Sequence, residues 1–321
     1  MTPRVALLVL SYNGVDLTLN CLASLRQSDY PDLDFILVDN ASQDNTVEAV
    51  RAAYPEIYVI ASRENLGYAA GNNVGVQAAL ERGATHVFLI NNDTTLEPDC
   101  VSALVRTAQA NPLIGMLGPM VYTWDTGHII SSAGGMVDWS HADAKNVGAG
   151  ENDRGQYVAR SVDFINGCGL MVTRTAIERA GMLDANFFMY WEETDWCLRV
   201  HAAGFEVWFE PAAPMRHKAP IHHQDLGPTT LYYVTRNRLF FFARHAPLHL
   251  KVIALARALR GAYTGARRHE REGRPEHAQA TRWAIIHAFQ RRWGRADANL
   301  WRSDATDRSL HSASKPSAPK P

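Results

Sequence analysis

The sequence predicts an α/β protein with a mixed, mostly parallel sheet flanked by helices and with a C-terminal helical extension. Three observations support this prediction. Short apolar runs alternate with amphipathic stretches in the first half, Gly-rich alternating stretches follow from about Gly118, and the chain becomes helical and basic from about Leu231. At 321 residues the chain is long enough to bury the large core that such a sheet requires.

The first half contains four short apolar runs, each closed by a polar or small residue. They are VALLVL (5–10), FILVD (35–39), IYVIA (57–61) and HVFLIN (86–91). Helical patterns follow them at 17–26, 45–53, 69–81 and 98–111. Continuous apolar runs joined by helices are typical of parallel strands buried on both faces. We therefore expect a doubly wound sheet here.

The second half of the sequence has a different pattern of apolar residues. MVYTW (120–124), HIISSAGGMVDW (128–139) and SVDFINGCGLMVT (161–173) indicate antiparallel strands and loops. Helices are expected at 174–180, 192–203, 248–271 and 276–293, with a strand at 206–209. We divide the chain into an α/β domain at 1–227, with halves at about 1–95 and 96–227, a basic helical extension at 228–302, and a low-complexity, disordered tail at 303–321.

Composition limits the class of protein. The hydrophobic content of 46% and the charged content of 20% are those of a soluble globular protein. The four cysteines form no CxxC pair, which favours reduced thiols in a cytoplasmic protein. No apolar stretch approaches the ~18 residues of a membrane span. We expect a cytoplasmic protein with no nucleic-acid partner.

The net charge of the whole chain is −1, but its C-terminal quarter is strongly basic. Residues 232–302 carry fifteen Lys or Arg and four acidic residues. Such a run forms either a solvated helical face or a contact with anionic lipid or a phosphate-bearing acceptor. The second alternative would place the protein peripherally on the inner face of the plasma membrane.

Compact polar groups close all four of the predicted strands: SYN (11–13), DNAS (39–42), REN (63–65) and NND (91–93). In doubly wound sheets, ligands bind at the carboxyl ends of the strands. Helix capping explains some of these groups but not easily all four.

The third of these strand ends leads into NLGYAAGNNVG (65–75). Its small residues would let backbone N–H groups at a helix start approach a phosphate. The pattern is not GxGxxG, so it does not support a dinucleotide site.

The strand leading into LINNDTTLEPD (89–99) is the strongest single signal for a cation. A carboxylate such as Asp93 beside an open crevice suits Mg²⁺ or Mn²⁺, which take oxygen ligands and bridge diphosphates. The alternative is that Asp93 caps a turn. Asp39, at an earlier strand end, either accepts hydrogen bonds from a base or ribose or forms an Asx-turn.

A second cluster, FFMYWEETDWCLR (187–199), gathers acids among aromatic rings. On a helix Glu192, Asp195 and Arg199 share a face, while Glu193 points about a quarter turn away. Burial and like charges would raise a carboxyl pKa and make a better general base. The alternative is a helix whose acids form ion pairs with Arg199.

Two further segments carry candidate residues. His217 stands in FEPAAPMRHK (209–218), and a lone histidine is more often structural than catalytic. YYVTRNRLFF (232–241) would aim Arg236 and Arg238 at a diphosphate. An amphipathic helix with solvated arginines explains the same spacing.

Taken together, these blocks resemble inverting glycosyltransferases of family 2, most closely the bacterial rhamnosyltransferase-like branch. The matching segments are VLSYNG (9–14), VDNASQD (38–44), ENLGYAAGNN (64–73), INND (90–93), INGCGLMVTR (165–174), GMLDANFFMYWEETDWCLR (181–199), RHK (216–218) and YYVTRNR (232–238). The resemblance implies a GT-A fold, a nucleotide-sugar donor and a divalent metal, Mg²⁺ or Mn²⁺.

The resemblance also implies roles for residues. Asp39 matches the position that contacts the nucleotide base, Asp93 the metal ligand of the DxD-like motif, and His217 a histidine that completes metal or diphosphate binding. Glu193 falls where the family usually has its catalytic aspartate, so Glu192 or Asp195 remain alternatives for the base. The expected nucleotide-sugar-binding residues are Ser11, Tyr12, Asn13, Asp39, Asn65, Gly67, Asn72, Asn91, Asn92 and Asp93. The expected acceptor-binding residues are Trp191, Trp196 and Gly167.

The implied partners are a dTDP-, UDP- or GDP-linked sugar and a glycan or polyprenyl- or lipid-linked acceptor in cell-surface polysaccharide synthesis. Two departures from the family pattern stand out: only one acid remains in the DxD-like motif, and the base is Glu instead of Asp. A sugar nucleotidyltransferase is one alternative, although SYNGVDLTL lacks the basic, glycine-rich loop it needs. The other is a non-catalytic carbohydrate- or lipid-binding module.

Overall fold

The computed structural model describes residues 2–124, 127–218 and 226–301. The tail predicted at 303–321 lies outside the described residues. The parallel core of the fold is made by β1 (Val5–Ser11), β2 (Leu33–Asp39), β3 (Tyr58–Ala61) and β4 (His86–Asn91). They alternate with α1 (Val15–Leu25), α2 (Thr46–Ala53), α3 (Gly67–Glu81) and α4 (Cys100–Ala110). The predicted strand and helix order is confirmed in this half.

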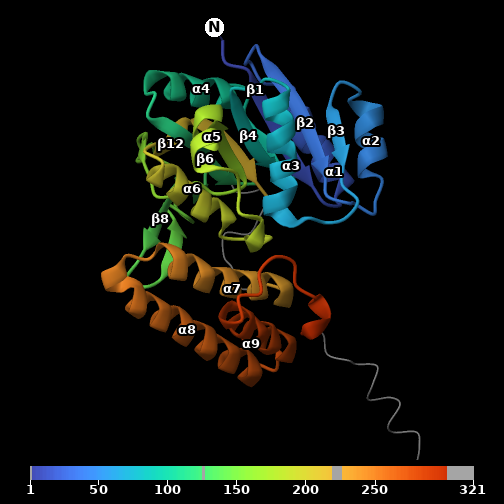
Figure 1. Cartoon of the computed structure of the whole chain (residues 1–321). Coiled ribbons are helices and arrows are strands. Elements are labelled where there is room, and N and C mark those ends of the chain that lie inside the picture. The colour runs from blue at the N-terminus through green and yellow to red at the C-terminus, as the bar shows by residue number, and fades with distance from the viewer. Residues whose placement is uncertain (1, 125–126, 219–225, 302–321) are drawn as a thin grey trace, which may run out of the picture.

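The register of these strands aligns their polar ends. Ser11 of β1 lies opposite Asp39 of β2, and Leu10 lies opposite Asn91 of β4. Apolar residues fill the strands because both faces are covered by helices, as Figure 1 shows for α3 on one face and α1 on the other. The strand ends that carry SYN, DNAS and NND therefore meet at one edge of the sheet.

The second half completes one mixed sheet. Its strands are β5 (Thr94–Leu96), β6 (Ile114–Thr123), β7 (Ile130–Ser132), β10 (Arg160–Ser161), β11 (Gly169–Thr173) and β12 (Glu206–His217). The order is β10-β12-β6-β11-β4-β1-β2-β3, with β5 beside β12 and β7 beside β6. A separate hairpin pairs β8 (Gly135–Asp138) with β9 (Asp143–Asn146). Helices α5 (Arg174–Ala180) and α6 (Glu192–Ala202) follow β11, with a short 3-10 turn, η1 (Ala185–Phe187), between them.

The prediction of antiparallel strands and loops from about Gly118 is confirmed for β7 beside β6, β8 beside β9, β10 beside β12 and β11 beside β4. Two features differ from the prediction: the strand expected at 206–209 extends to His217, and this strand, β12, runs parallel to β6. Every residue of β6 is buried, so its sequence shows no alternation. In β12, Pro211 and Pro214 interrupt the pattern, and the register shifts between Glu210 and Pro214.

Three helices form a layer below the sheet in Figure 1: α7 (Pro228–His245), α8 (Leu248–Arg271) and α9 (Pro275–Phe289). The chain then continues through a 3-10 turn, η3 (Ala298–Leu300), to Trp301, which packs on Tyr232. Phe241 and Phe242 of α7 belong to the same apolar core as the sheet. The predicted division at 227/228 coincides with the start of α7 and stays a prediction. Among the described residues, no helix combines the length and the hydropathy needed to cross a bilayer.

Candidate active site

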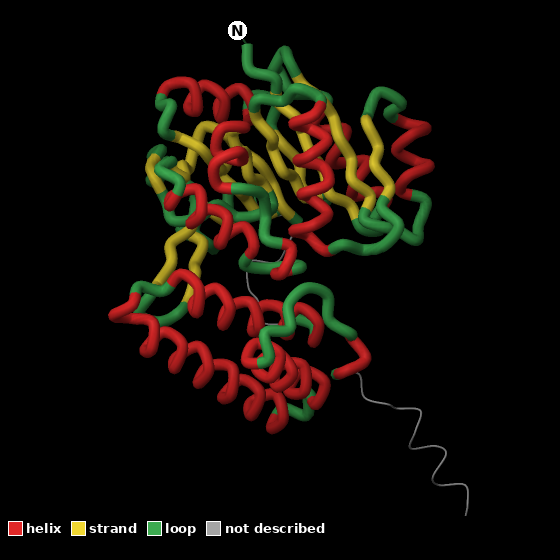
Figure 2. The backbone as a smooth tube through the Cα atoms, in the orientation of Figure 1, coloured by secondary structure: helices red, strands yellow, loops and turns green. Residues whose placement is uncertain are grey.

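A cavity of about 670 Å³ lies between the carboxyl ends of the sheet and the C-terminal helices. Figure 2 shows that the loops after the strands face this helical layer. The volume is within the range of small-ligand sites. Among the predicted nucleotide-sugar residues, Tyr12, Asn65, Gly67, Asn91, Asn92 and Asp93 line it. The helical side contributes Thr229, Tyr233, Arg295, Asp297 and Asn299.

Other predicted residues support the cavity wall without lining it. The Asn92 amide donates to Ser11 Oγ at 3.3 Å and to the Asn13 carbonyl at 3.3 Å. Asn13 itself has a φ of 59° and accepts from the Gln43 backbone through its side chain. Asn72 donates to the Tyr68 carbonyl from within α3. These residues hold the loops that shape the cavity.

Asp39 lies buried at the end of β2, with 2% of its surface exposed. The Ser42 backbone N–H donates to its Oδ2 at 3.0 Å, while its Oδ1 has no hydrogen-bond partner among the described residues. Buried polar atoms are rarely left unpaired, so this oxygen is available to a ligand donor. Its neighbour Asn40 does line the cavity and binds the backbone of Leu66 and Gly67. Asn40 was not singled out from the sequence, although it stands in the same DNAS block.

The start of α3 must approach the loop before α6 very closely. Gly67 has a φ of 78°, and a Cβ there would lie 2.4 Å from the Phe188 carbonyl oxygen. That loop is strained in turn, because Phe188, Tyr190 and Trp191 all have positive φ values. Such strain persists only where the surroundings hold the backbone in place, and it gathers at functional sites.

Asn237 of α7 holds this strained loop. Its amide donates to the carbonyls of Phe187, Met189 and Tyr190 at 2.8, 2.8 and 2.9 Å. One buried side chain therefore fixes the backbone that leads into the acidic start of α6. The sequence reasoning missed Asn237, and its place inside the YYVTRNR block was the available signal.

Asp93 and His217 meet beside the cavity because β5 pairs with the end of β12 and brings His217 opposite Thr94. His217 Nε2 lies 3.2 Å from Asp93 Oδ1. This oxygen is buried and accepts no well-aligned hydrogen bond from the described residues.

The two groups shift each other's pKa. Burial raises the pKa of Asp93, but the nearby imidazole outweighs it and lowers that pKa. Burial lowers the pKa of His217, but Cys168 and Asp93 outweigh it and raise that pKa to about 10.

A carboxylate oxygen without a donor, facing an imidazole nitrogen, fits a divalent cation. Both atoms are common ligands of Mn²⁺, and metal binding would release the imidazole proton. Within the described residues, no group of three or more His, Cys, Asp or Glu side chains could hold a metal ion. Further ligands would come from water and diphosphate oxygens, as is usual for Mg²⁺-type sites.

Glu192 and Glu193 open α6 with their side chains facing inward. One carboxylate oxygen of each is buried without a hydrogen-bond partner among the described residues. Burial, followed by the charge of Glu193, raises the pKa of Glu192 well above its usual value. Burial also raises the pKa of Glu193. Carboxyls in this state hold or accept a proton at a higher pH than ordinary glutamates do.

Gly167 and Cys168 connect the acidic helix to the Asp93–His217 pair. A Cβ on Gly167 would lie 3.5 Å from Cγ of Glu193, and the Gly167 carbonyl accepts from the Tyr68 hydroxyl at 2.5 Å. The next residue, Cys168, interacts with the His217 imidazole. Tyr68 lines the cavity, which places Glu193 immediately behind its wall. The Tyr68 hydroxyl is a second residue that the sequence reasoning missed.

Asp195 has a different role from the one considered in the sequence. Its oxygens accept from Arg199 at 2.8 Å and from His245 at 2.6 Å, and Arg244 lies 3.2 Å away. Burial raises the pKa of Asp195, but these partners outweigh it and lower that pKa. A carboxylate engaged in this way is a poor base, so the geometry corrects its catalytic assignment to a structural one.

The two tryptophans also lie outside the cavity. Trp196 is fully buried and donates from Nε1 to the Gly181 carbonyl, while Trp191 packs on Phe241 and Phe242. Trp196 belongs to the buried core and Trp191 packs against that core, so neither ring lines the cavity, and their acceptor-binding role stays a prediction.

Neither predicted diphosphate-binding arginine points into the cavity. Arg236 is buried and donates to the carbonyls of Gly294 and Phe187. Arg238 donates to the carbonyl of Ala142 in the β8–β9 hairpin. Both guanidinium groups already donate hydrogen bonds to backbone carbonyls. The predicted diphosphate-binding role of the two arginines is therefore replaced by a structural one. Arg295 is the arginine that lines the cavity.

Comparisons with known proteins show what this chain is similar to. The family model described as glycosyl transferase family 2 matches residues 7–169. An N-acetylglucosaminyl-diphospho-decaprenol L-rhamnosyltransferase of Mycobacterium tuberculosis is 26% identical over 245 residues, covering 70% of this chain and 80% of the relative. The dTDP-rhamnosyl transferase RfbF of Shigella flexneri is 25% identical over 270 residues, covering 78% and 84%.

Solved structures show the same fold. The mannosyltransferase PcManGT from Pyrobaculum calidifontis, in complex with GDP-Man and Mn²⁺, matches with a TM-score of 0.56 at 18% identity. That match covers 97% of this chain and 81% of the other. S. aureus TarS 1–349, in complex with UDP-GlcNAc, matches with a TM-score of 0.61 at 13% identity and covers 90% and 81%. The predicted GT-A fold is thereby confirmed.

Proposed function

The chain belongs to glycosyl transferase family 2 and is a glycosyltransferase, and from this premise we propose that it inverts the anomeric carbon of the sugar it transfers. The observation that best supports the proposal is the pairing of Asp93 with His217 at 3.2 Å, with Glu193 close by behind Gly167. A cation site on the cavity and a buried base behind its wall suit a single in-line displacement.

In the proposed reaction, Glu193 removes the proton from an acceptor hydroxyl. The hydroxyl oxygen forms a bond to the anomeric carbon while the bond from that carbon to the diphosphate oxygen breaks. The proton stays on Glu193, whose raised pKa suits it to hold one. Tyr68 and Gly167 fix the wall beside Glu193.

The donor diphosphate is expected to lie near Asp93, which lines the cavity together with Gly67 at the start of α3. Asp93 and His217 would hold the divalent cation, Mg²⁺ or Mn²⁺. When bound, that ion neutralises charge on the departing nucleotide, a contribution of several kcal/mol. Asp39 accepts a hydrogen bond from the nucleoside through its unpaired Oδ1.

For the substrates, we propose dTDP-rhamnose as the donor and a polyprenyl-diphosphate-linked glycan as the acceptor. The names of the Shigella and Mycobacterium relatives support these two choices. The basic C-terminal helices favour peripheral contact with the anionic inner face of the plasma membrane, where such an acceptor is found.

Donor binding can be tested by thermal stabilisation. Purified protein is heated with dTDP-rhamnose, UDP-glucose or GDP-mannose, each with and without Mn²⁺. A ligand at about 100 times its Kd stabilises the native state by ~2.7 kcal/mol, enough for a shift of several degrees. We expect the largest shift with dTDP-rhamnose and Mn²⁺. A larger shift with another donor would reassign the sugar, and no shift with any of them would contradict the proposal.

A further inference from the structure

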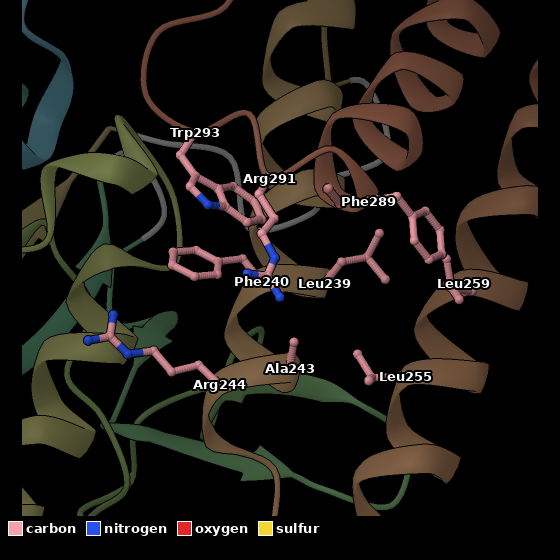
Figure 3. A pocket seen from close by; sticks show the side chains of 10 residues that line it. Leu239, Phe240, Ala243, Arg244, Leu255, Leu259, Phe289, Arg291 and Trp293 are labelled. Carbon is pink, nitrogen blue, oxygen red and sulfur yellow. The ribbon is translucent and has the colours of Figure 1, made fainter.

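A second cavity, of about 420 Å³, lies between α7, α8 and α9. Figure 3 shows it as a groove whose walls come from all three helices and the segment that follows α9. Its walls are almost entirely apolar, and its main lining residues are Leu239, Phe240, Leu255, Leu259, Phe289 and Trp293. A volume of this size falls within the range of ligand pockets.

The apolar surface continues out of the groove along α8. Leu248 and Val252 precede Leu255 and Leu259 at helical spacing, so all four share one stripe. Leu248 is 87% exposed, Val252 is 79% exposed and, on α9, Phe289 is 70% exposed. From Leu248 to Leu259 a helix rises ~16 Å. The groove therefore opens into an extended apolar path, and exposed apolar patches of this kind mark binding surfaces.

A cation lies at this apolar groove. Arg291 lines it, and Figure 3 shows its side chain reaching down beside Phe240 and Leu239. Within the described residues, its guanidinium makes no hydrogen bond or ion pair. Apolar walls with one unpaired cation are complementary to a molecule that has an apolar chain and an anionic head.

Two of the residues that line the groove connect it to the surroundings of the active site. Arg244 lines it, yet its guanidinium lies 3.2 Å from Asp195, two residues after Glu193. Trp293 lines the groove and stacks on Phe240, while Arg295 lines the donor cavity. Arg244 and the segment from Trp293 to Arg295 therefore connect the groove to the elements around the donor cavity.

We propose that this groove binds the apolar chain of a phosphate-linked lipid acceptor. The proposal rests on the proposed function, since it assigns the lipid part of the same acceptor to a place in the fold. Leu239, Leu255 and Leu259 contact the chain, and Arg291 faces its phosphate. The tail at 302–321 is a poor competitor for the groove, because its composition is polar, with Leu310 as its one large apolar residue.

The test measures binding of hexyl, octyl, decyl and dodecyl phosphate to the full chain by calorimetry, below their micelle concentrations. If the chain enters the groove, affinity rises by roughly tenfold for every two added methylenes until the groove is full. A flat dependence on chain length would overturn the proposal. So would binding detected only with phosphatidylglycerol vesicles, which would indicate a bilayer surface.

Two variants locate the site. Ala243→Trp fills the groove and should abolish the chain-length dependence, whereas Ala256→Trp, on the exposed part of α8 outside the groove, should retain it. Arg291→Asn should weaken the binding of every alkyl phosphate by a similar factor. The increase in affinity with chain length should stay unchanged. Asparagine tolerates the positive φ of this position. Equal losses in both tryptophan variants, with melting by circular dichroism unaltered, would contradict the assignment.

Two further observations separate this proposal from its alternatives. If light scattering showed a dimer that Ala243→Trp dissociates, a second copy would be the occupant and the proposal would fall. The titration needs no turnover, so chain-length-dependent binding by a protein inactive on all nucleotide sugars would refute only the proposed function. An active enzyme with flat binding would refute only the lipid groove.

Discussion

His217 Nε2 lies 3.2 Å from Asp93 Oδ1, although one residue follows β4 and the other ends β12. The contact depends on the antiparallel pairing of β5 with the end of β12. Asp93 lines a cavity whose opposite wall belongs to the C-terminal helices, and His217 lies beside Asp93 behind that lining. Under the proposed function, this pair would offer a cation two ligands although the DxD-like motif holds one acid.

Asp93→Asn should remove the metal dependence of donor binding. The amide keeps the shape of the side chain but loses the charge that a hard cation needs. We expect the extra thermal stabilisation that Mn²⁺ gives with a nucleotide sugar to disappear in this variant. Asp16→Asn, an exposed substitution in α1, is the matched control and should behave as wild type. An undiminished Mn²⁺ effect in Asp93→Asn would place the cation elsewhere.

The pH dependence of transfer reports on Glu193. A base acts only when deprotonated, and burial raises the pKa of Glu193 above its usual 4.5. Activity should therefore fall, as the pH is lowered, at a higher pH than an ordinary glutamate would produce. The measurement is kcat/KM across pH 4 to 9 at a fixed Mn²⁺ concentration. An acid limb at or below the ordinary glutamate pKa would argue against a buried base.

Glu192 should make stability decrease as the pH rises. Its pKa is raised in the folded state, mainly by burial, so the folded state retains a proton that the unfolded chain has already lost. Stability is therefore lost from the ordinary glutamate pKa upward to the raised one. Glu192→Gln removes this charge, and its free energy of unfolding relative to wild type should increase as the pH rises above the ordinary glutamate pKa. If the free energies of unfolding of the two proteins changed in parallel with pH, burial would not be raising the pKa of Glu192.

Asn237→Ala tests the clamp on the strained loop before α6. Its amide serves three carbonyls, and a buried group left unsatisfied costs ~1–3 kcal/mol. We expect a lower free energy of unfolding by at least that amount in urea titrations, together with a lower kcat. Asn45→Ala is a suitable control, because the Asn45 side chain makes no capping hydrogen bond. Equal free energies of unfolding in the two variants would mean that the loop before α6 keeps its conformation without the Asn237 hydrogen bonds.

Much of the fold could be predicted because its pattern is local. The four parallel strands and their helices were recognisable as apolar runs that end in polar residues. Strands β6 and β12 were harder, since β6 is buried throughout and two prolines interrupt β12. The length of these two strands depends on pairing with strands that are distant in sequence. The local alternation of apolar and polar residues does not predict such pairing.

The sequence predicted which types of residue belong to the candidate site better than it predicted the contacts that these residues make. Asp93 was recognised as a carboxylate at a strand end, whereas Glu193 was singled out within its acidic, aromatic cluster by its match to the family's catalytic position. Asp195 and Arg236 look equally functional in the sequence, yet each is engaged by partners from other elements, His245 in one case and the Gly294 carbonyl in the other. Asn237 was missed for the converse reason, because a polar side chain inside a helix gives no sign of the loop it holds.

The central claim is that Glu193 is the base of a glycosyl transfer in this cavity. It is tested most directly by acceptor-dependent release of nucleoside diphosphate from wild type and Glu193→Gln at saturating donor and Mn²⁺. Glu178→Gln, a substitution of an exposed glutamate on α5, serves as the control. We predict that Glu193→Gln lowers kcat by ~10²–10⁴-fold while the Kd for the donor is retained. A kcat within a factor of two of wild type, with donor binding intact, would contradict the claim.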